Sequence, residues 1–197
     1  MKAGNALAVL LLASVVGASN AAPQRIVSLN LCADELALRL APPGTVKSVT
    51  WLARDPTLSN VSALAHEVPV NRGLAEDVVP LAPDLAIAGA HTTRTAVALL
   101  QRLGIPVLEL PVPSSVDEAL AQIATVAAAL GATEKGTQLI ADIRSGLSEV
   151  PIAPTGSSHV IAAVYQPNGL TIGKGSLVND LLNRAGLRNL AVERRID

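Results

Sequence analysis

The sequence predicts an α/β protein whose parallel sheets are flanked by helices. Short aliphatic and β-branched runs alternate with helically spaced leucines from residue 25 onward, and a stretch near the middle is almost wholly helical in pattern. The alternation then resumes towards the end of the chain. These three observations predict an N-terminal α/β lobe over 22–113, a helical spine over 114–150 and the start of a second α/β lobe over 151–197.

Residues 1–21 have the pattern of a secretory signal peptide. Met1 and Lys2 precede an apolar run over 6–18, and small residues follow it. The run is shorter than the roughly 20 residues that a membrane span needs, so cleavage after Ala21 is favoured over a permanent anchor. We therefore expect an exported protein.

The first lobe begins with a strand, a helix and a second strand. Residues 25–29 form a β-branched run, leucines at helical spacing predict a helix over 34–40, and the Pro-Pro-Gly sequence at 42–44 ends it. The run over 46–52 predicts the second strand. A long polar connection over 54–73 follows, and loops of that length often carry function.

Two more helices and two more strands complete this lobe. A short helix is predicted over 75–81, ended by Pro83, and a strand over 85–89. A threonine caps the helix over 92–103, a glycine closes it, and 105–110 forms the fourth strand. Such alternation is typical of a parallel sheet with helices on both faces.

Two helices make up the predicted spine. The serine pair at 114–115 caps the first, with Glu118 at capping-box distance from the second serine, and apolar positions continue to Leu130. The second covers 133–150. Together they are much longer than the crossovers before them, which indicates a connection between lobes.

The second lobe only begins. A linker over 151–158 precedes a strand over 159–165, a turn, a short return strand over 170–172 and a helix over 177–185. One or two strands and one helix cannot bury both faces of a sheet, so we expect this lobe to be incomplete and to expose apolar surface.

Composition excludes several classes of function. With 15 Lys and Arg against 16 Asp and Glu, the net charge is -1, and one Trp, one Tyr and no Phe cannot build a base-stacking platform. We expect no nucleic-acid partner. Cys32 is the one cysteine, so no internal disulfide forms, and its apolar setting favours a buried structural thiol.

Motifs for catalysis, nucleotides and metals are weak. The glycines of 169–176 are spaced one residue short of a phosphate loop, and no dinucleotide fingerprint or nucleophile elbow occurs. His66, His91 and His159 are dispersed, without a second ligand at helical spacing. We therefore predict no catalytic residue, no metal and no cofactor.

Both aromatic residues fall at predicted carboxyl ends of strands, one in each lobe. Trp51 follows the second strand and Tyr165 ends the first strand of the second lobe. In open α/β sheets ligands bind at that edge, so two rings facing one crevice would supply contact area for a ligand. The alternative is that each ring packs at the surface of its own lobe.

Four segments resemble periplasmic substrate-binding proteins of the iron-siderophore and vitamin B12 class. They are 25–36, 73–89, 103–107 and 171–182, in matching order. The resemblance implies two Rossmann-like lobes joined by one rigid interdomain helix, with the ligand in the cleft and no chemistry performed on it. It also implies delivery to an inner-membrane ABC permease with its ATPase, by a protein we expect to be monomeric.

The resemblance also assigns roles to residues. Glu76 matches a surface glutamate that docks on arginines of the permease, and the alternative is a carboxylate at a helix start that faces water. Arg54 could face an anionic group of the ligand or pair with Asp55. The positions that match the ligand loops of the family are Asn30, Leu31, Trp51, Leu52, Arg54, Asp55, His91, Tyr165, Gln166 and Asn168.

The ligand and two other functions stay open at this stage. A metal chelate is expected, cobalamin or a ferric siderophore, with haem less favoured because Tyr165 is the one tyrosine ligand. The family's second lobe continues beyond the point that matches Asp197. A secreted α/β enzyme and a ligand-sensing fragment without a transport role are the alternatives.

Overall fold

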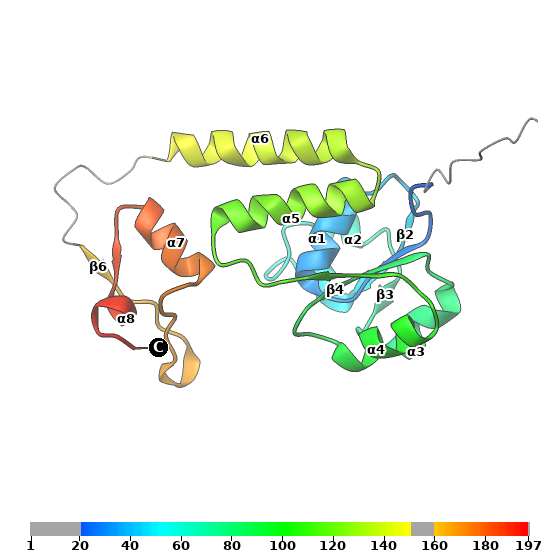
Figure 1. Ribbon diagram of the computed structural model, residues 1–197, viewed down its shortest axis with the longest axis horizontal. Helices are drawn as coiled ribbons and strands as arrows, with labels where there is room; N and C mark the ends of the chain where they lie inside the picture. Colours follow the sequence, from blue (N-terminus) through cyan, green and yellow to red (C-terminus); the bar gives the residue numbers. More distant parts are fainter. Residues whose placement is uncertain (1–20, 151–159, 197) are drawn as a thin grey trace, which may run out of the picture.

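The computed structural model describes residues 21–150 and 160–196, which form two unequal lobes connected by a pair of helices (Figure 1). The predicted linker and all but the last residue of the predicted signal peptide lie outside the described residues. The predicted α/β class with a parallel sheet is confirmed.

The larger lobe is built on five parallel strands in the order β3-β2-β1-β4-β5. The strands are β1 (Ile26–Ser28), β2 (Val46–Thr50), β3 (Val70–Asn71), β4 (Leu85–Gly89) and β5 (Val107–Leu110). The helices that accompany them, with two 3₁₀ turns, are α1 (Leu31–Leu40), η1 (Trp51–Arg54), α2 (Ser62–Ala65), α3 (Ala75–Val78), η2 (Val79–Leu81), α4 (Arg94–Arg102), α5 (Val116–Ala129) and α6 (Thr133–Glu149).

Helices cover both faces of the sheet because alternate strand residues point to opposite sides. On one face, Ile26 and Ile87 are fully buried against α1 and α5. On the other face, Val27 and Ala86 are fully buried against α4, through residues such as Leu100. Since both faces are covered, the strands read as almost continuous apolar runs, which is typical of parallel sheets.

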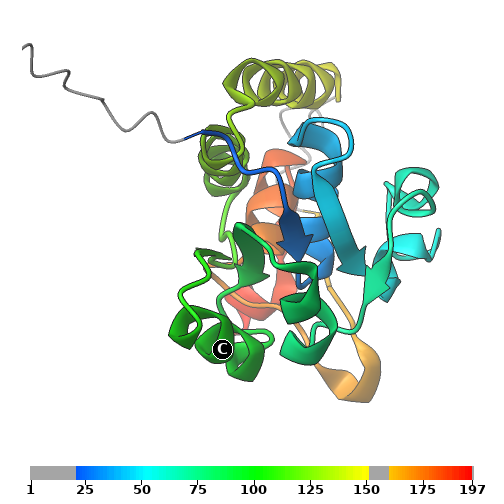
Figure 2. The ribbon, with the colours of Figure 1, turned by 90° about the vertical axis from the view of Figure 1, so that its right-hand side faces the viewer.

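The connection consists of two antiparallel helices rather than one long helix. Ser115 Oγ accepts from the N–H of Glu118 at 3.1 Å, which caps α5, and Gly131 turns the chain with a φ of 66°. A Cβ at Gly136 would lie 2.3 Å from Ala127 Cβ, so this glycine lets α6 approach α5 closely. Figure 2 shows α6 on the side of α5 away from the sheet.

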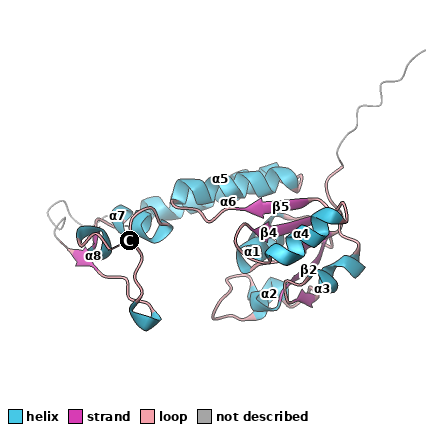
Figure 3. Cartoon of the chain, turned by 60° about the horizontal axis from the view of Figure 1, so that its bottom comes forward, coloured by secondary structure: helices cyan, strands magenta, loops and turns pink. Residues whose placement is uncertain are grey.

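The second lobe is small. Its elements are β6 (Ile161–Ala162), η3 (Pro167–Gly169), α7 (Leu177–Arg184), β7 (Arg188–Asn189) and α8 (Leu190–Glu193), and β6 pairs with β7 in parallel. Figure 3 places this lobe at one end of the α5–α6 pair and the five-stranded sheet at the other. The expectation of an incomplete second lobe is confirmed.

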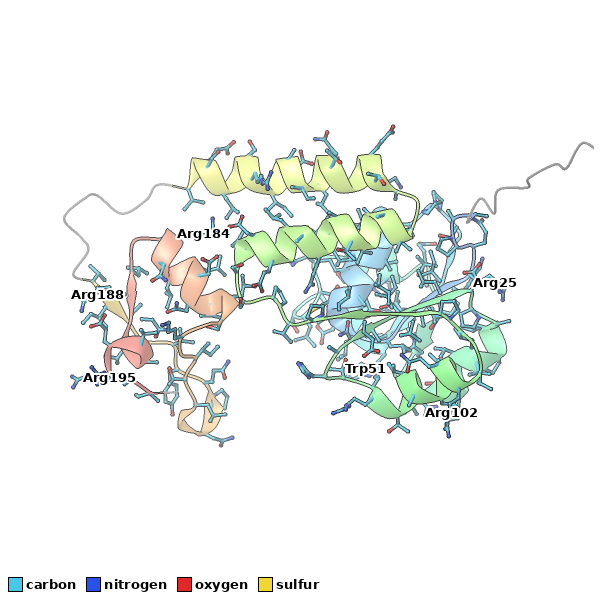
Figure 4. The ribbon with its side chains drawn as sticks, in the orientation of Figure 1. Arg25, Trp51, Arg102, Arg184, Arg188 and Arg195 are labelled. Atoms are coloured by element: carbon cyan, nitrogen blue, oxygen red, sulfur yellow. The ribbon has the colours of Figure 1, made fainter. Side chains whose placement is uncertain are left out.

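Polar contacts attach the second lobe to the first turn of α5. The backbone N–H of Val116 donates to Asp180 Oδ2 at 2.9 Å, and Arg184 pairs with Asp117 at 2.9 Å. Figure 4 shows Arg184 on α7, beside α5. Leu177 packs against the apolar cluster of the first lobe. The second lobe is therefore held mainly at one helix end.

The boundaries of several predicted elements are wrong. The strand predicted over 46–52 ends at Thr50, and the polar connection after it contains η1, α2 and β3. The helix expected at residue 34 begins at Leu31, and the helix over 75–81 divides into α3 and η2. In the described part of the second lobe, β6 is short, and 170–172 contributes one antiparallel bridge in place of a strand.

Candidate functional site

The strand order reverses between β1 and β4, which makes this pair the topological switch point of the sheet. In open parallel sheets, ligands bind outside the carboxyl ends of the strands at such a point. Asn30 follows β1 and His91 follows β4. The structure thus brings two of the residues predicted from sequence to one edge of the sheet.

Asn30 fixes the geometry of this edge. Its side-chain oxygen accepts from the N–H of Ala33 at 2.8 Å, which caps α1, and its Nδ2 donates to Thr92 Oγ1 at 3.3 Å. A Cβ at Gly89 would lie 2.2 Å from Asn30 Nδ2 and 2.8 Å from Thr92 Oγ1. Only glycine therefore allows Asn30 to bridge the ends of β1 and β4.

A groove of about 540 Å³ opens beside this edge, between α1 and the α5–α6 pair. Its volume is that of a typical small-molecule site, and its walls are mostly apolar. The side chains that line it are those of Asn30, Cys32, Glu35, Leu36, Arg39, His91, Thr92, Leu110, Pro111, Val112, Pro113, Ala119, Gln122, Ile123, Leu139 and Ile143.

The charged groups at this groove neutralise one another. Arg39 pairs with Glu35 at 3.0 Å, one helical turn apart on α1. Cys32 lies on the same side of α1 and is exposed, so the expectation of a buried structural thiol is wrong. Partial desolvation, with the nearby carboxylates of Glu35 and Asp34, raises the pKa of the Cys32 thiol and keeps it protonated at neutral pH.

Trp51 is held in place by a buried carboxylate. Asp34, fully buried in the first turn of α1, accepts from the N–H of Thr50 at 2.9 Å and from its hydroxyl. Burial raises the pKa of Asp34, although these hydrogen bonds oppose the shift. Since Thr50 ends β2, Asp34 fixes the start of η1, where Trp51 is 56% exposed and Leu52 half-buried. Leu31 packs beneath η1 in a small apolar cluster.

Arg54 and Asp55 both hydrogen-bond to neighbouring parts of the chain, and among the described residues no ion pair joins their side chains. The predicted local pair is therefore wrong, and a contact of Arg54 with the ligand remains a prediction. Arg54 donates through Nε to the carbonyl of Ala65 at 3.2 Å and through Nη2 to that of Val68 at 2.7 Å. Asp55 Oδ1 accepts from the N–H of Thr57 at 2.8 Å and from its hydroxyl at 2.7 Å, which lowers the pKa of Asp55. The two side chains hold the loop between η1 and α2.

The second-lobe candidates lie together on one turn, away from the groove. Tyr165 is 80% exposed, the N–H of Gln166 donates to the carbonyl of Leu170 at 2.9 Å, and Asn168 has a left-handed φ of 66°. Neither Tyr165 nor Trp51 lines the groove, and the two rings belong to different lobes. A crevice lined by both aromatics remains a prediction.

Glu76 is an exposed residue of α3. Its neighbour Asp77 accepts from the backbone and the guanidinium of Arg72, and these hydrogen bonds lower the pKa of Asp77 to about 2. Among the described residues no ion pair involves Glu76. Its carboxylate is thus accessible to a positively charged partner.

Within residues 21–150 and 160–196, no three His, Cys, Asp or Glu side chains converge as a metal site would require. Over the same ranges, none of the helices has both the length and the hydropathy for crossing a membrane.

Comparison with known proteins identifies the family. The sequence profile described as "Periplasmic binding protein" matches residues 26–196. The chain belongs to the periplasmic binding protein family. Members of this family bind solutes and are not enzymes, so the enzyme alternative is set aside.

Curated and solved relatives support this assignment. The chain is 28% identical to a cobalamin-binding protein of Halobacterium salinarum over 87% of its own length and 47% of that protein. The vitamin B12 binding protein BtuF of Vibrio cholerae is 21% identical with a TM-score of 0.64, covering 85% of this chain and 66% of that one. A periplasmic heme-binding protein of Pseudomonas aeruginosa is 23% identical with a TM-score of 0.66. The match covers 85% of this chain and 63% of that one.

The two solved structures show the fold of this periplasmic binding protein and not its ligand, because their sequence identities are low. The chain spans about half the length of the curated relative. As the resemblance implied, its two lobes correspond to those of two-lobed periplasmic binding proteins.

Sequence analysis missed most of the groove wall. On α1, Cys32, Leu36 and Arg39 share one helical face, and on α6, Leu139 and Ile143 are one turn apart. The spacing alone could have placed these residues on common faces. It could not show that the faces of α1 and α6 line one groove, because that depends on how α5 and α6 pack.

Proposed function

We propose that this chain is the solute-binding component of an ABC importer. It captures a metal chelate, namely cobalamin, a ferric siderophore or haem, in the periplasm and delivers it to an inner-membrane permease driven by its ATPase. The observation that carries the proposal is the mostly apolar groove at the β1/β4 switch point. Large chelates present extended apolar surface, and such a groove suits them.

The ligand is held between the lobes in this proposal. Asn30 and His91 contact it from the switch point, and Trp51 contributes an exposed ring from the neighbouring strand end. Tyr165 and the turn that follows it contact the ligand from the second lobe. Arg54 and Asp55 act indirectly, because their polar atoms already hold the adjoining loop.

Glu76 docks the permease in this proposal. Support comes from its exposure and from the pairing of Arg72 with Asp77, which leaves the Glu76 carboxylate available for an arginine of the partner. The protein acts as a monomer in this proposal.

Ligand titration tests the proposal. The purified protein is titrated with cyanocobalamin, ferrichrome and hemin, with calorimetry and Trp51 fluorescence as independent readouts and far-UV circular dichroism as the folding control. We expect saturable binding of one chelate, with a change in Trp51 emission. A folded protein that binds none of the three would overturn the proposed function.

A further inference from the structure

An Asn-Gly pair lies in the turn that follows Tyr165 in the second lobe. Asn168 and Gly169 belong to η3, which projects from the rest of that lobe (Figure 1). The turn is closed by the N–H of Gln166, which donates to the carbonyl of Leu170 at 2.9 Å. Both residues of the pair are exposed, so water has access to them on the folded protein.

The side-chain amide of an asparagine can react with the backbone nitrogen of the residue that follows it. That nitrogen loses its proton to the solvent and forms a bond with Cγ of the asparagine. The side-chain nitrogen takes up a proton from water and leaves as ammonia, and water then opens the cyclic succinimide at either carbonyl. The products are aspartate and isoaspartate, and the net reaction consumes water and releases ammonia without an enzyme, an oxidant or a reductant. Asparagine is therefore a thermolabile residue.

The conformation of the pair favours this reaction. Asn168 has a left-handed φ of 66°, and Gly169 has a φ of 76°. Apart from the adjoining residues, no atom of the described chain lies within 4 Å of the point where a Cβ of Gly169 would lie. The backbone nitrogen of Gly169 can therefore approach Cγ of Asn168 with no side chain in its path. Because η3 is one 3₁₀ turn, whose hydrogen bonds are poorly aligned, it resists this rearrangement only weakly.

The other asparagines of the described chain lack this combination. Four of them have side-chain oxygens that already accept a hydrogen bond from a described residue, namely Asn30, Asn71, Asn179 and Asn189. Asn60 is exposed, but the β-branched Val61 follows it. Asn183 is exposed too, but Arg184 follows it within α7, where helical hydrogen bonds hold the backbone nitrogen. Exposure, a glycine neighbour and an unrestrained turn thus coincide at Asn168.

From this combination we infer that Asn168 is a site of spontaneous deamidation. Residues 160–173 contain no Asp, Glu, Lys or Arg, so the new carboxylate is the one charged side chain of this segment at neutral pH. Isoaspartate also adds a methylene group to the main chain of the turn. The modification itself does not depend on the proposed function. Its effect on ligand binding does rest on that function, which assigns this turn to ligand contact.

Peptide mapping of the unmodified protein tests the modification. The protein is incubated in mildly alkaline buffer, sampled over several days and digested with trypsin, and the fragments are sequenced by mass spectrometry. Asn168 is the one asparagine of the tryptic peptide 145–174, and Asn183 lies in the peptide 175–184. We expect Asn168 to deamidate about tenfold or more faster than Asn183, because the following glycine leaves the path open. A rate at Asn168 that does not exceed the rate at Asn183 would overturn the inference.

Gly169→Ala is the matched variant. Its methyl group points into open space in the folded turn, yet it obstructs the approach of the backbone nitrogen to Cγ of Asn168. We expect deamidation of Asn168 to be about tenfold slower in this variant. An unchanged rate would show that the glycine does not control the reaction and would also overturn the inference. Far-UV circular dichroism confirms that the variant is folded.

Asn168→Asp separates the modification from the proposed function. The variant and the parent protein are titrated with cyanocobalamin, ferrichrome and hemin. We expect the variant to bind the chelate that the parent protein binds about threefold or more weakly, because a carboxylate in contact with the ligand loses hydration. Equal affinities would show that deamidation does not act on the ligand site. If the folded parent protein binds none of the three, the importer function fails together with this effect, whereas the peptide map still decides the modification.

Discussion

The two lobes differ in how they are stabilised. In the first lobe, β1 and β4 are buried on both faces, and Ile26, Ile87 and Leu100 are fully inaccessible. In the described part of the second lobe, Asn189 and Ala191 alone are buried. The first lobe contains its own apolar core, whereas the second depends on its attachment to α5.

The same contrast appears in the helices. The apolar residues of α4 are inserted into a buried cluster, and Leu100 is completely covered. α7 has a comparable amphipathic pattern, yet none of its residues is buried, and Leu181 is 43% exposed. Amphipathic sequence therefore indicates where a helix can pack, and the available partner surface decides how much area it buries.

The largest expected difference between the lobes is in core substitutions. Leu100→Ala leaves a cavity in the closed cluster of the first lobe, and we expect a loss of about 3 kcal/mol in the free energy of unfolding. Leu181→Ala removes a half-exposed side chain, and we expect a change of about 0.5 kcal/mol. Urea unfolding followed by far-UV circular dichroism measures both. Equal losses would mean that the second lobe has a core of its own.

Glycine substitutions give the next largest difference. Gly89→Ala places a Cβ against Asn30 and Thr92 in the packed edge, so we expect a loss of about 1–3 kcal/mol and a weakened ligand site. Gly146→Ala is the matched control, because its Cβ meets nothing within 4 Å in the open end of α6. There the better helix propensity of alanine stabilises by about 0.5–1 kcal/mol. Thermal unfolding of both variants tests this prediction. We expect Gly89→Ala to lower the Tm and Gly146→Ala to raise it.

The sequence was sufficient for elements whose pattern is local. β1, β4 and β5 are apolar runs bounded by Gly, Pro or Asn, and Ser115 with Glu118 marks the start of α5. It was insufficient at Trp51, because the β-branched and aromatic residues of the run over 46–52 continue past Thr50, and periodicity cannot separate a strand end from a 3₁₀ turn. The contacts of Arg54 with two carbonyls and the groove itself depend on tertiary packing, which no local pattern encodes.

The two lobes should respond oppositely to acid through one carboxylate in each. Burial raises the pKa of Asp34 above its unfolded value, so its protonated form favours the folded state. That stabilisation is complete below the unfolded pKa of about 4 and is lost as the pH rises through the folded pKa. Relative to Asp34→Asn, the parent protein should therefore lose stability as the pH rises from about 4. Urea unfolding midpoints of the parent protein and of Asp34→Asn, measured at several pH values, test this prediction. Midpoints that change with pH in parallel in the two proteins would contradict it.

We expect the smallest effect on stability at Asp180, and its pH dependence has the opposite sign to that of Asp34. The hydrogen bond from the backbone N–H of Val116 lowers the pKa of Asp180, and the hydrogen bond from Arg184 lowers it by a smaller amount. The charged form of Asp180 therefore favours docking of α7 on α5. This contribution is present above the unfolded pKa and is lost as the pH falls through the folded pKa.

Asp180→Ala should therefore increase hydrogen exchange in α7 and β7 while leaving exchange in the strands of the first lobe unchanged. Glu193→Ala is the control, because it removes the ion pair with Arg188 inside the second lobe and none of the contacts to α5. Exchange that rises equally in both variants would show that α7 is held by its own lobe. Exchange that spreads into β4 in Asp180→Ala would show that the two lobes unfold as one unit, because loss of a contact at the end of α5 would then reach the five-stranded sheet.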